Sequence, residues 1–173
     1  RSYGGVAGVF KAYCTRVGEG PFPSEIHGEE GDSIREQAGE FGTTTGRARR
    51  IGWFDAVAGR YSARVNGFDA MIITKLDILD GWEEVNICVA YEIDGVRTEQ
   101  FPVDAVTLDR AKPIYETHPG WTESTRSITK NSELNDGARA YIHRLEELIG
   151  VPTKILSTGP RREETLVIED FLA

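Results

Sequence analysis

The chain has 173 residues, of which 39% are hydrophobic, so it can bury a core of ordinary size, and its length predicts one compact unit over residues 1–173. Its 20 Lys and Arg residues against 28 Asp and Glu residues give a formal net charge of -8, which argues against non-specific binding to nucleic acid because the chain repels a phosphate backbone. No stretch approaches the roughly 18 consecutive apolar residues of a membrane span, so no membrane partner is expected.

The cysteines and the first residues bear on the cellular setting. Cys14 and Cys88 are far apart and show neither metal-ligand nor redox spacing, so we expect two free thiols in a reducing, cytoplasmic compartment. The chain starts at Arg1 without Met, carries no charged leader and runs at once into an apolar segment. We therefore expect residue 1 to be a cut end and the chain to be a fragment.

Apolar periodicity and the placement of Gly and Pro predict helices that alternate with buried strands, which is typical of an α/β protein. In chain order, the expected elements are a strand at residues 9–13, a loop at 16–23, a short helix at 33–38, a loop at 42–50, a helix at 55–66, a buried strand at 69–74, two paired strands at 84–93 and 96–101, a loop around 115–121, a helix at 133–149, and strands at 153–156 and 165–169.

Two local signals are the sharpest. The dipeptide Asp94-Gly95 joins two β-rich runs and is the sequence of a tight hairpin turn. The helix at 133–149 carries an apolar stripe, with Ser132 placed to cap its start and Gly150 placed to end it. We therefore predict a mixed sheet with flanking helices and a β-hairpin.

A polar loop before residue 50 combines hydroxyl groups, a glycine and guanidinium groups. Such a loop can offer backbone N–H groups, hydroxyl donors and bidentate Arg forks to carboxylate or phosphate oxygens. From composition alone, a solvated basic turn explains it equally well. The candidate anion-binding residues are Thr43, Thr44, Thr45, Gly46, Arg47, Ala48 and Arg49.

Two short segments follow expected strands, where ligands of open α/β sheets bind. In Lys75-Leu76-Asp77, the carboxylate can accept the guanine N1–H and N2–H together, which adenine cannot supply, while the Lys stem packs along the base. A surface ion pair is the alternative. Ser157-Thr158-Gly159 can supply backbone donors to a base carbonyl, or be a plain turn. The chain has no Gly-rich phosphate loop followed by Lys.

Five blocks occur together and in order: KAYCTRVGEGPFP at residues 11–23, TTGRARRIGW at 44–53, TKLD at 74–77, PGW at 119–121 and STGP at 157–160. This series resembles the adenylosuccinate synthetase family from end to end of the chain. The resemblance implies the carboxy-terminal part of a P-loop-NTPase-like α/β fold. It also implies a GTP-dependent ligase in which GTP phosphorylates the 6-oxygen of IMP and the amine of L-aspartate then attacks, giving adenylosuccinate.

Residue roles also follow from the resemblance. The arginine loop, residues 43–49, is implied to close over L-aspartate, with Arg47 also reaching IMP and Arg49 also contacting GTP. Val17 is implied to contact IMP, and the two strand-end segments are implied to bind the guanine base of GTP. Ala48 departs from the family pattern, in which this position is often basic.

The rest of the catalytic machinery is implied to lie outside this chain. The phosphate loop, the catalytic Asp and His and the Mg²⁺ ligands belong to the family's amino-terminal part, so we expect neither catalytic residues nor metal ligands here and no activity alone. A homodimer is implied for the whole enzyme. Two alternatives stay open: a stand-alone guanine-nucleotide-binding module, and a structural or interaction protein whose site has decayed.

Overall fold

The computed structural model describes residues 5–126 and 128–168, so residue 1 and the expected strand end at residue 169 lie outside the described residues. By its contacts the chain forms two compact units, each assembled from segments that interleave along the sequence. The length of the chain does not reveal this interleaving. Unit 1 comprises Arg1–Ala12, Gly59–Val85 and His118–Ala173, and unit 2 comprises Tyr13–Ala58 and Asn86–Thr117.

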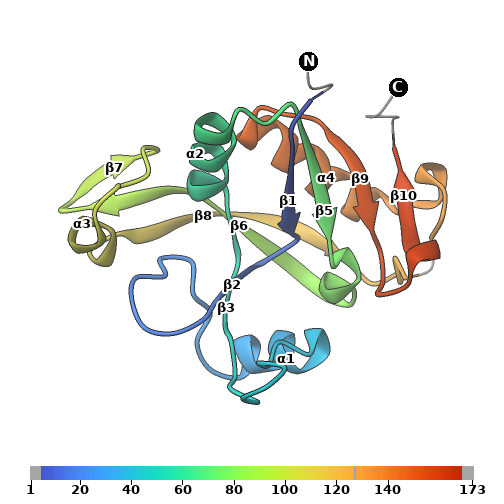
Figure 1. Cartoon of the computed structure of the whole chain (residues 1–173), viewed down its shortest axis with the longest axis horizontal. Helices are drawn as coiled ribbons and strands as arrows, with labels where there is room; N and C mark the ends of the chain where they lie inside the picture. Colours follow the sequence, from blue (N-terminus) through green and yellow to red (C-terminus); the bar gives the residue numbers. More distant parts are fainter. Residues whose placement is uncertain (1–4, 127, 169–173) are drawn as a thin grey trace. The chain divides into compact units, whose positions relative to one another are not determined.

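Unit 1 contains a four-stranded sheet in the order β1 (Ala7–Lys11), β5 (Ala70–Thr74), β9 (Thr153–Ser157) and β10 (Thr165–Val167) (Figure 1). The first three strands are parallel, and β10 runs antiparallel to β9. Because β5 has a neighbour on each side, its sequence is apolar, and Met71 and Ile73 are fully buried. The buried strand expected at 69–74 is confirmed.

The long helix α4 (Asp136–Ile149) belongs to the same unit. It is capped by Asn135, whose side chain accepts a hydrogen bond from the Ala138 N–H at 2.8 Å. The expected Ser132 cap is wrong, because Ser132 lies in the 3₁₀ turn η2 (Asn131–Glu133) that precedes the helix. Gly150 ends the helix with φ of 86°, as its position predicts.

Helix α2 (Ala56–Asn66) confirms the helix expected at 55–66. The carboxylate of Asp55 accepts a hydrogen bond from the Ala58 N–H at 3.0 Å and another from the Tyr91 hydroxyl at 2.5 Å. Burial raises the pKa of Asp55, and the bond from Tyr91 works against this rise. Asp55 therefore ties the start of α2 to the buried cluster of unit 2, in which Tyr91 packs with Val57 and Cys88.

The remaining elements include two further sheets. Strands β2 (Cys14–Arg16) and β3 (Arg50–Gly52) form an antiparallel pair, and β6 (Trp82–Ile93) pairs with β4 (Phe54–Asp55), β7 (Val96–Thr98) and β8 (Lys112–Trp121). Helices α1 (Glu29–Ala38) and α3 (Ala105–Asp109) complete the set, so the helix expected at 33–38 begins four residues earlier.

The hairpin prediction is confirmed, and the neighbouring loop prediction is wrong. Asp94 and Gly95 have φ of 52° and 80°, the two positive values that a tight hairpin turn of this type requires. Residues 115–121, expected as a loop, belong to β8. Gly120 is needed for close packing here: a Cβ on it would lie 1.9 Å from the Trp82 carbonyl oxygen. The glycine thus marks a close strand contact.

Candidate functional site

The register of the unit 1 sheet brings the two predicted base-binding segments to one edge. β5 and β9 are parallel neighbours, with Ile73 opposite Leu156 near their carboxyl ends. Lys75-Leu76-Asp77 follows β5 directly, and Ser157-Thr158-Gly159 begins at the last residue of β9. Segments that are far apart in the sequence therefore leave the sheet side by side, in the position where open α/β sheets bind ligands.

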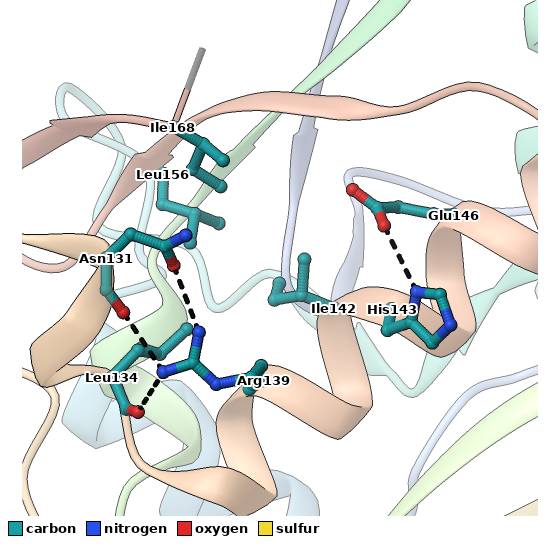
Figure 2. Close-up of a pocket in the computed structure, with 8 residues that line it drawn as sticks. All are labelled: Asn131, Leu134, Arg139, Ile142, His143, Glu146, Leu156 and Ile168. Atoms are coloured by element: carbon teal, nitrogen blue, oxygen red, sulfur yellow. Dashed lines mark hydrogen bonds and ion pairs between the residues drawn. The ribbon is translucent and has the colours of Figure 1, made fainter.

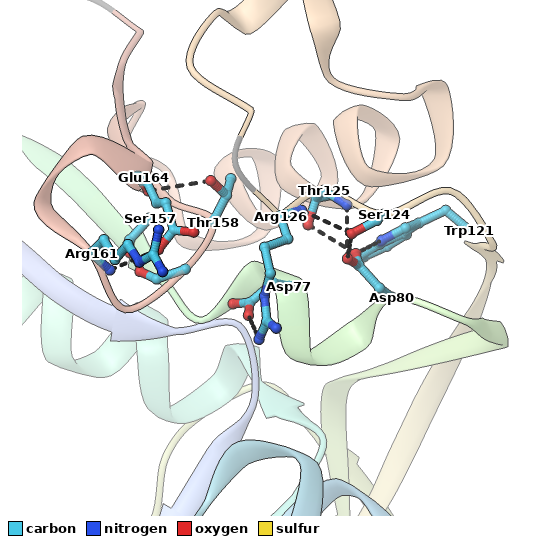
Figure 3. A network of polar contacts seen from close by, with 11 residues as sticks. Asp77, Asp80, Trp121, Ser124, Thr125, Arg126, Ser157, Thr158, Arg161 and Glu164 are labelled. Atoms are coloured by element: carbon cyan, nitrogen blue, oxygen red, sulfur yellow. Dashed lines mark hydrogen bonds and ion pairs between the residues drawn. The ribbon is translucent and has the colours of Figure 1, made fainter.

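Asp77 is a buried acidic residue at this edge. Lys75 adopts a left-handed conformation, with φ of 59°, and turns the chain into the 3₁₀ turn η1 (Leu76–Leu79). The side chain of Asp77 is 5% exposed, and its Oδ2 accepts a hydrogen bond from Nη2 of Arg126 at 3.0 Å (Figure 3). Burial raises the pKa of Asp77, while the bond and charge of Arg126 lower it; the burial effect is the larger.

Asp80 anchors the segment that carries Arg126. Its carboxylate accepts hydrogen bonds from the Trp121 indole at 2.7 Å, the Ser124 hydroxyl at 3.1 Å, and the Thr125 N–H and hydroxyl at 2.7 and 2.8 Å (Figure 3). The sequence analysis missed both Asp80 and Arg126. Their partners lie 41 to 49 residues away, so no local pattern could reveal them.

The second turn at this edge is rigid. Thr158 is fully buried, its N–H donates to the Glu164 carbonyl at 2.9 Å, and its hydroxyl lies 3.2 Å from the carbonyls of Ile128 and Glu164. A Cβ on Gly159 would lie 2.4 Å from the Glu164 carboxylate, which accepts the Arg161 N–H at 2.7 Å. The structure thus gives Thr158 an inward-facing side chain, leaving Ser157 and Gly159 at the partly exposed surface of the turn.

In unit 2, Val17 and the arginine loop emerge at one end of the β2–β3 pair. The last pair in the register is Arg16 opposite Arg50. Val17 follows the first of these residues and Arg49 precedes the second, so the backbones of both loops begin beside each other. Val17 is 76% exposed, which makes it available to a ligand. The structure therefore brings together the predicted IMP-contacting residue and the base of the arginine loop.

The arginine loop is a closed turn with an exposed rim. The Gly42 N–H donates to the Arg47 carbonyl and the Gly46 N–H to the Gly42 carbonyl, both at 2.8 Å, and Gly46 has φ of 64°. Phe41 and Ala48 form an isolated antiparallel bridge below it. The exposed residues are Thr43, Thr44, Thr45, Gly46, Arg47 and Ala48.

The base of this loop rests on a buried carboxylate. Nη1 of Arg49 donates to Oε2 of Glu40 at 2.5 Å, and the hydroxyl of Tyr13 donates to Oε1 of Glu40 at 2.6 Å. The Arg49 N–H also donates to the Glu40 carbonyl at 3.0 Å. The Glu40 side chain has no exposed surface. The sequence analysis missed Glu40 and Tyr13; an acidic residue just before a basic loop was the available signal.

The loop after Val17 is held by guanidinium groups. Arg16 donates to the Glu19 carbonyl at 2.9 Å, and Arg50 donates to the Gly20 carbonyl at 2.7 Å. Arg50 also forms two parallel bonds to the Glu25 carboxylate, at 2.8 and 2.6 Å. These bonds hold the pKa of Glu25 below its ordinary value and raise the pKa of Arg50.

A separate pocket of about 240 Å³ lies in unit 1 between α4 and the ends of β9 and β10 (Figure 2). The guanidinium of Arg139 at its wall donates to the carbonyls of Asn131 and Leu134, at 3.1 and 2.8 Å, and is thus occupied by the protein's own backbone. None of the predicted site residues lines it. The lining residues are Asn131, Leu134, Arg139, Ile142, His143, Glu146, Leu156 and Ile168.

Within residues 5–126 and 128–168, no group of three or more His, Cys, Asp or Glu side chains is arranged to hold a metal ion. None of the helices in the described part of the chain has the length and apolar character that crossing a bilayer requires. Cys14 and Cys88 are not joined in a disulfide, and burial raises the pKa of the Cys88 thiol.

The fold is that of an open α/β protein, and Lys75-Leu76-Asp77 and Ser157-Thr158-Gly159 lie at the carboxyl ends of two parallel strands, where such folds bind ligands. The profile of the adenylosuccinate synthetase family matches residues 1–166. The chain belongs to the adenylosuccinate synthetase family, so the family resemblance and the fold class predicted from the sequence are confirmed.

Individual relatives agree with this assignment. The adenylosuccinate synthetase of Trichodesmium erythraeum is 55% identical over 165 residues, which cover 95% of this chain and 38% of that protein. The Streptomyces coelicolor enzyme is 51% identical, covering 96% of this chain and 39% of that protein. A structure of fully ligated adenylosuccinate synthetase from Plasmodium falciparum matches with a TM-score of 0.91 and 36% identity, over 95% of this chain and 40% of that one. The chain thus spans about two-fifths of the length of its relatives.

Proposed function

We propose that this chain supplies the base-binding and amino-acid-binding segments of a GTP-dependent ligase that joins L-aspartate to IMP and yields adenylosuccinate, GDP and phosphate. The observation that carries the proposal is the meeting of Lys75-Leu76-Asp77 and Ser157-Thr158-Gly159 at one edge of a parallel sheet. Family membership supports the same reading. The catalytic residues are assigned to the part of the relatives that this chain does not match.

At the strand-end edge, Asp77 recognises the base. An ionised carboxylate has two acceptor oxygens, which match the N1–H and the N2–H of guanine, whereas adenine has no donor at N1. Arg126 donates to the same carboxylate, so the bound base shares it or displaces the guanidinium. The Lys75 stem packs along the base plane, and the turn at Ser157 and Gly159 offers backbone N–H groups to the base carbonyl.

At the arginine loop, Arg47 and Arg49 bind the carboxylates of L-aspartate, with the loop's hydroxyls and backbone N–H groups as further donors. Arg47 is exposed on the rim and also reaches IMP. Val17, exposed on the neighbouring loop, contacts IMP by apolar packing. These residues hold the amino acid and the purine nucleotide so that the aspartate amine can attack the activated C6 position and displace phosphate.

Magnesium, the dimer and the cellular location belong to the same proposal. Mg²⁺ would balance the charge of the phosphates, and the side chains described here do not form a group that fits it, so its ligands are assigned to the unmatched part of the relatives. The whole protein is proposed to be a cytoplasmic homodimer.

A chimera tests the function. The chain is joined to the part of the Trichodesmium erythraeum enzyme that it does not match, and adenylosuccinate formation is followed with GTP, ITP and ATP. We expect Asp77→Asn to raise the KM for GTP roughly 5- to 150-fold, the equivalent of about 1 to 3 kcal/mol for a buried unpaired polar group. It should also reduce the preference for GTP over ITP, which lacks the N2 amine. The matched control is Asp109→Asn, at an exposed position of α3.

Two outcomes would count against the proposal. Unchanged GTP kinetics in the Asp77→Asn chimera would remove Asp77 from base recognition. A chimera that binds GTP but forms no adenylosuccinate would favour the stand-alone binding module over the ligase.

A further inference from the structure

The acidic residue beneath the arginine loop is placed to do more than stabilise the fold. Glu40 is fully buried, yet both oxygens of its carboxylate are bonded, one by Arg49 at 2.5 Å and the other by Tyr13 at 2.6 Å. A buried carboxylate without partners is costly, so Glu40 requires donors such as Arg49 and Tyr13 in this position. Tyr13 itself is 2% exposed, which places the acceptor in a rigid setting.

The contact to Glu40 leaves Arg49 with donors to spare. A guanidinium carries five N–H donors in a planar fork, and the ion pair uses one nitrogen, Nη1. The Arg49 side chain is 30% exposed, so part of it reaches solvent while its partner does not. The backbone is held as well, because the Arg49 carbonyl accepts a hydrogen bond from Arg35 of α1 at 2.7 Å. Arg49 is thus held by Glu40 and Arg35, while part of its side chain remains accessible to solvent.

The two arginines of the loop therefore differ in electrostatic character. The charge of Arg49 is balanced by Glu40 at short range, whereas Arg47 lies exposed on the rim. A balanced guanidinium attracts free anions weakly but keeps its geometry, which is what bidentate recognition of a carboxylate needs. A guanidinium without a nearby carboxylate attracts anions more strongly, but its orientation is less fixed.

We propose that Glu40, supported by Tyr13, is a positioning residue that holds the Arg49 guanidinium in the orientation required to receive a carboxylate of the amino-acid substrate. This deepens the proposed function and rests on it. Glu40 acts through Arg49 and does not touch the substrate. Its loss frees the guanidinium to sample other rotamers, so binding of the amino acid then has to order the side chain again.

The experiment compares Glu40→Gln with Tyr13→Phe in the chimera. We expect Glu40→Gln to raise the KM for L-aspartate roughly tenfold and Tyr13→Phe to raise it about threefold, with a smaller rise in the KM for GTP, which Arg49 is also implied to contact. Glu36→Gln, an exposed glutamate on α1 four residues away, is the matched control and should leave all constants unchanged.

A double-mutant cycle separates positioning from a structural role. If Glu40 acts through Arg49, adding Glu40→Gln to an Arg49→Gln chimera should change the aspartate KM by less than about twofold, because the group it positions is already gone. A full tenfold additional effect, or an unchanged aspartate KM in Glu40→Gln alone, would overturn the proposal.

A readout that needs no activity tests the hold of Glu40 on Arg49 separately from the ligase assignment. Trypsin should cleave the chimera after Arg47 at similar rates with and without Glu40→Gln, and cleave after Arg49 roughly tenfold faster in the variant, since the freed side chain can enter the protease. Equal rates after Arg49 would show that Glu40 does not hold it. An inactive parent chimera that still shows this protection would reject the proposed ligase function while leaving the hold on Arg49 intact.

Discussion

The strand-end edge of unit 1 and the arginine loop of unit 2 obtain their geometry in different ways. At the edge, the parallel register of β5 and β9 sets where Asp77 and Ser157 leave the sheet. At the loop, the rim is exposed, and its base is fixed by a buried ion pair between Glu40 and Arg49. The first region is positioned by main-chain pairing within a sheet, whereas the second combines the main-chain hydrogen bonds of a turn with a buried ion pair at its base.

This difference predicts different sensitivities. A site positioned by main-chain pairing should tolerate changes in its exposed side chains but not changes that crowd its backbone. A loop positioned by ion pairs should respond to loss of a charge and to pH, because salt bridges and their hydrogen bonds depend on ionisation. Five substitutions in the chimera, two of them as a matched pair, test this contrast from the largest expected effect to the smallest.

Asp80→Ala should have the largest effect, a loss of stability. It would show that unit 1 also depends on a side chain, the acceptor that anchors the segment carrying Arg126. It leaves the Trp121 indole N–H and the Thr125 N–H without their acceptor. We expect the free energy of unfolding to fall by about 3 kcal/mol, since hydrogen bonds to a charged group are stronger than neutral ones. Urea unfolding measures it, with Asp109→Ala as the exposed control; a loss no larger than the control's would contradict it.

Gly159→Ala and Gly46→Ala form a matched pair across the two regions. The first methyl group would meet the Glu164 carboxylate at 2.4 Å, whereas the second meets nothing within 4 Å but sits at φ of 64°. We expect Gly159→Ala to raise the GTP KM about tenfold by deforming the rigid turn. Gly46→Ala should raise the aspartate KM about fivefold, and the KM for IMP with it because the neighbouring Arg47 also reaches IMP, through backbone strain of about 1 kcal/mol. A rise in the aspartate KM for Gly159→Ala and in the GTP KM for Gly46→Ala would contradict the comparison.

Glu25→Gln tests the pH dependence of a second ion pair in unit 2, the Glu25–Arg50 pair that holds the loop after Val17. The bonds from Arg50 lower the pKa of Glu25 in the folded protein, so the pair contributes stability above the ordinary value of 4.5 and loses it as the pH falls through the folded pKa below 4.5. At pH 7 the variant should be less stable by about 1 kcal/mol, and near pH 3 the difference should shrink. Thermal unfolding at both pH values checks this; a constant difference would exclude an ionic cause.

Thr45→Ala should have the smallest effect on stability. Its hydroxyl accepts the Arg47 N–H at 3.3 Å in an exposed turn, so the free energy of unfolding should change by less than about 0.5 kcal/mol. The aspartate KM should nevertheless rise if the hydroxyl is a donor to the substrate, as proposed. A stability loss above 1 kcal/mol, roughly the contribution of a well-formed hydrogen bond, would mean that the rim itself is part of the folded core.

The sequence predicted the parts of the fold that depend on local chemistry. The hairpin at Asp94-Gly95 and the buried strand at 69–74 were readable because turn dihedrals and strand burial leave direct marks on composition. β8 was missed because Pro119 and Gly120 are loop formers in isolation, and the Trp82 carbonyl that requires the glycine lies far away in sequence. The helix start was misplaced because Ser132 and Asn135 are both good caps.

The segments of the candidate site could also be predicted from the sequence, but the side chains that hold them could not. The family blocks indicated which segments bind, and the register of β5 and β9 then showed that two of them meet. Glu40, Asp80 and Arg126 were missed because their roles come from partners brought in by folding, 9 to 49 residues away. The roles of the individual site residues stay predictions until the chimera is measured.

The interleaving of the two units has a consequence for synthesis on the ribosome. The last segment of unit 2 ends at Thr117, whereas unit 1 cannot complete its sheet until β9 and β10 have been made. The pairing of β5 with β9 must also close a loop that contains the segment Asn86–Thr117, and long loops and parallel pairing are slow to form. The arginine loop should therefore be shaped during translation, and the strand-end edge only after β9 has emerged.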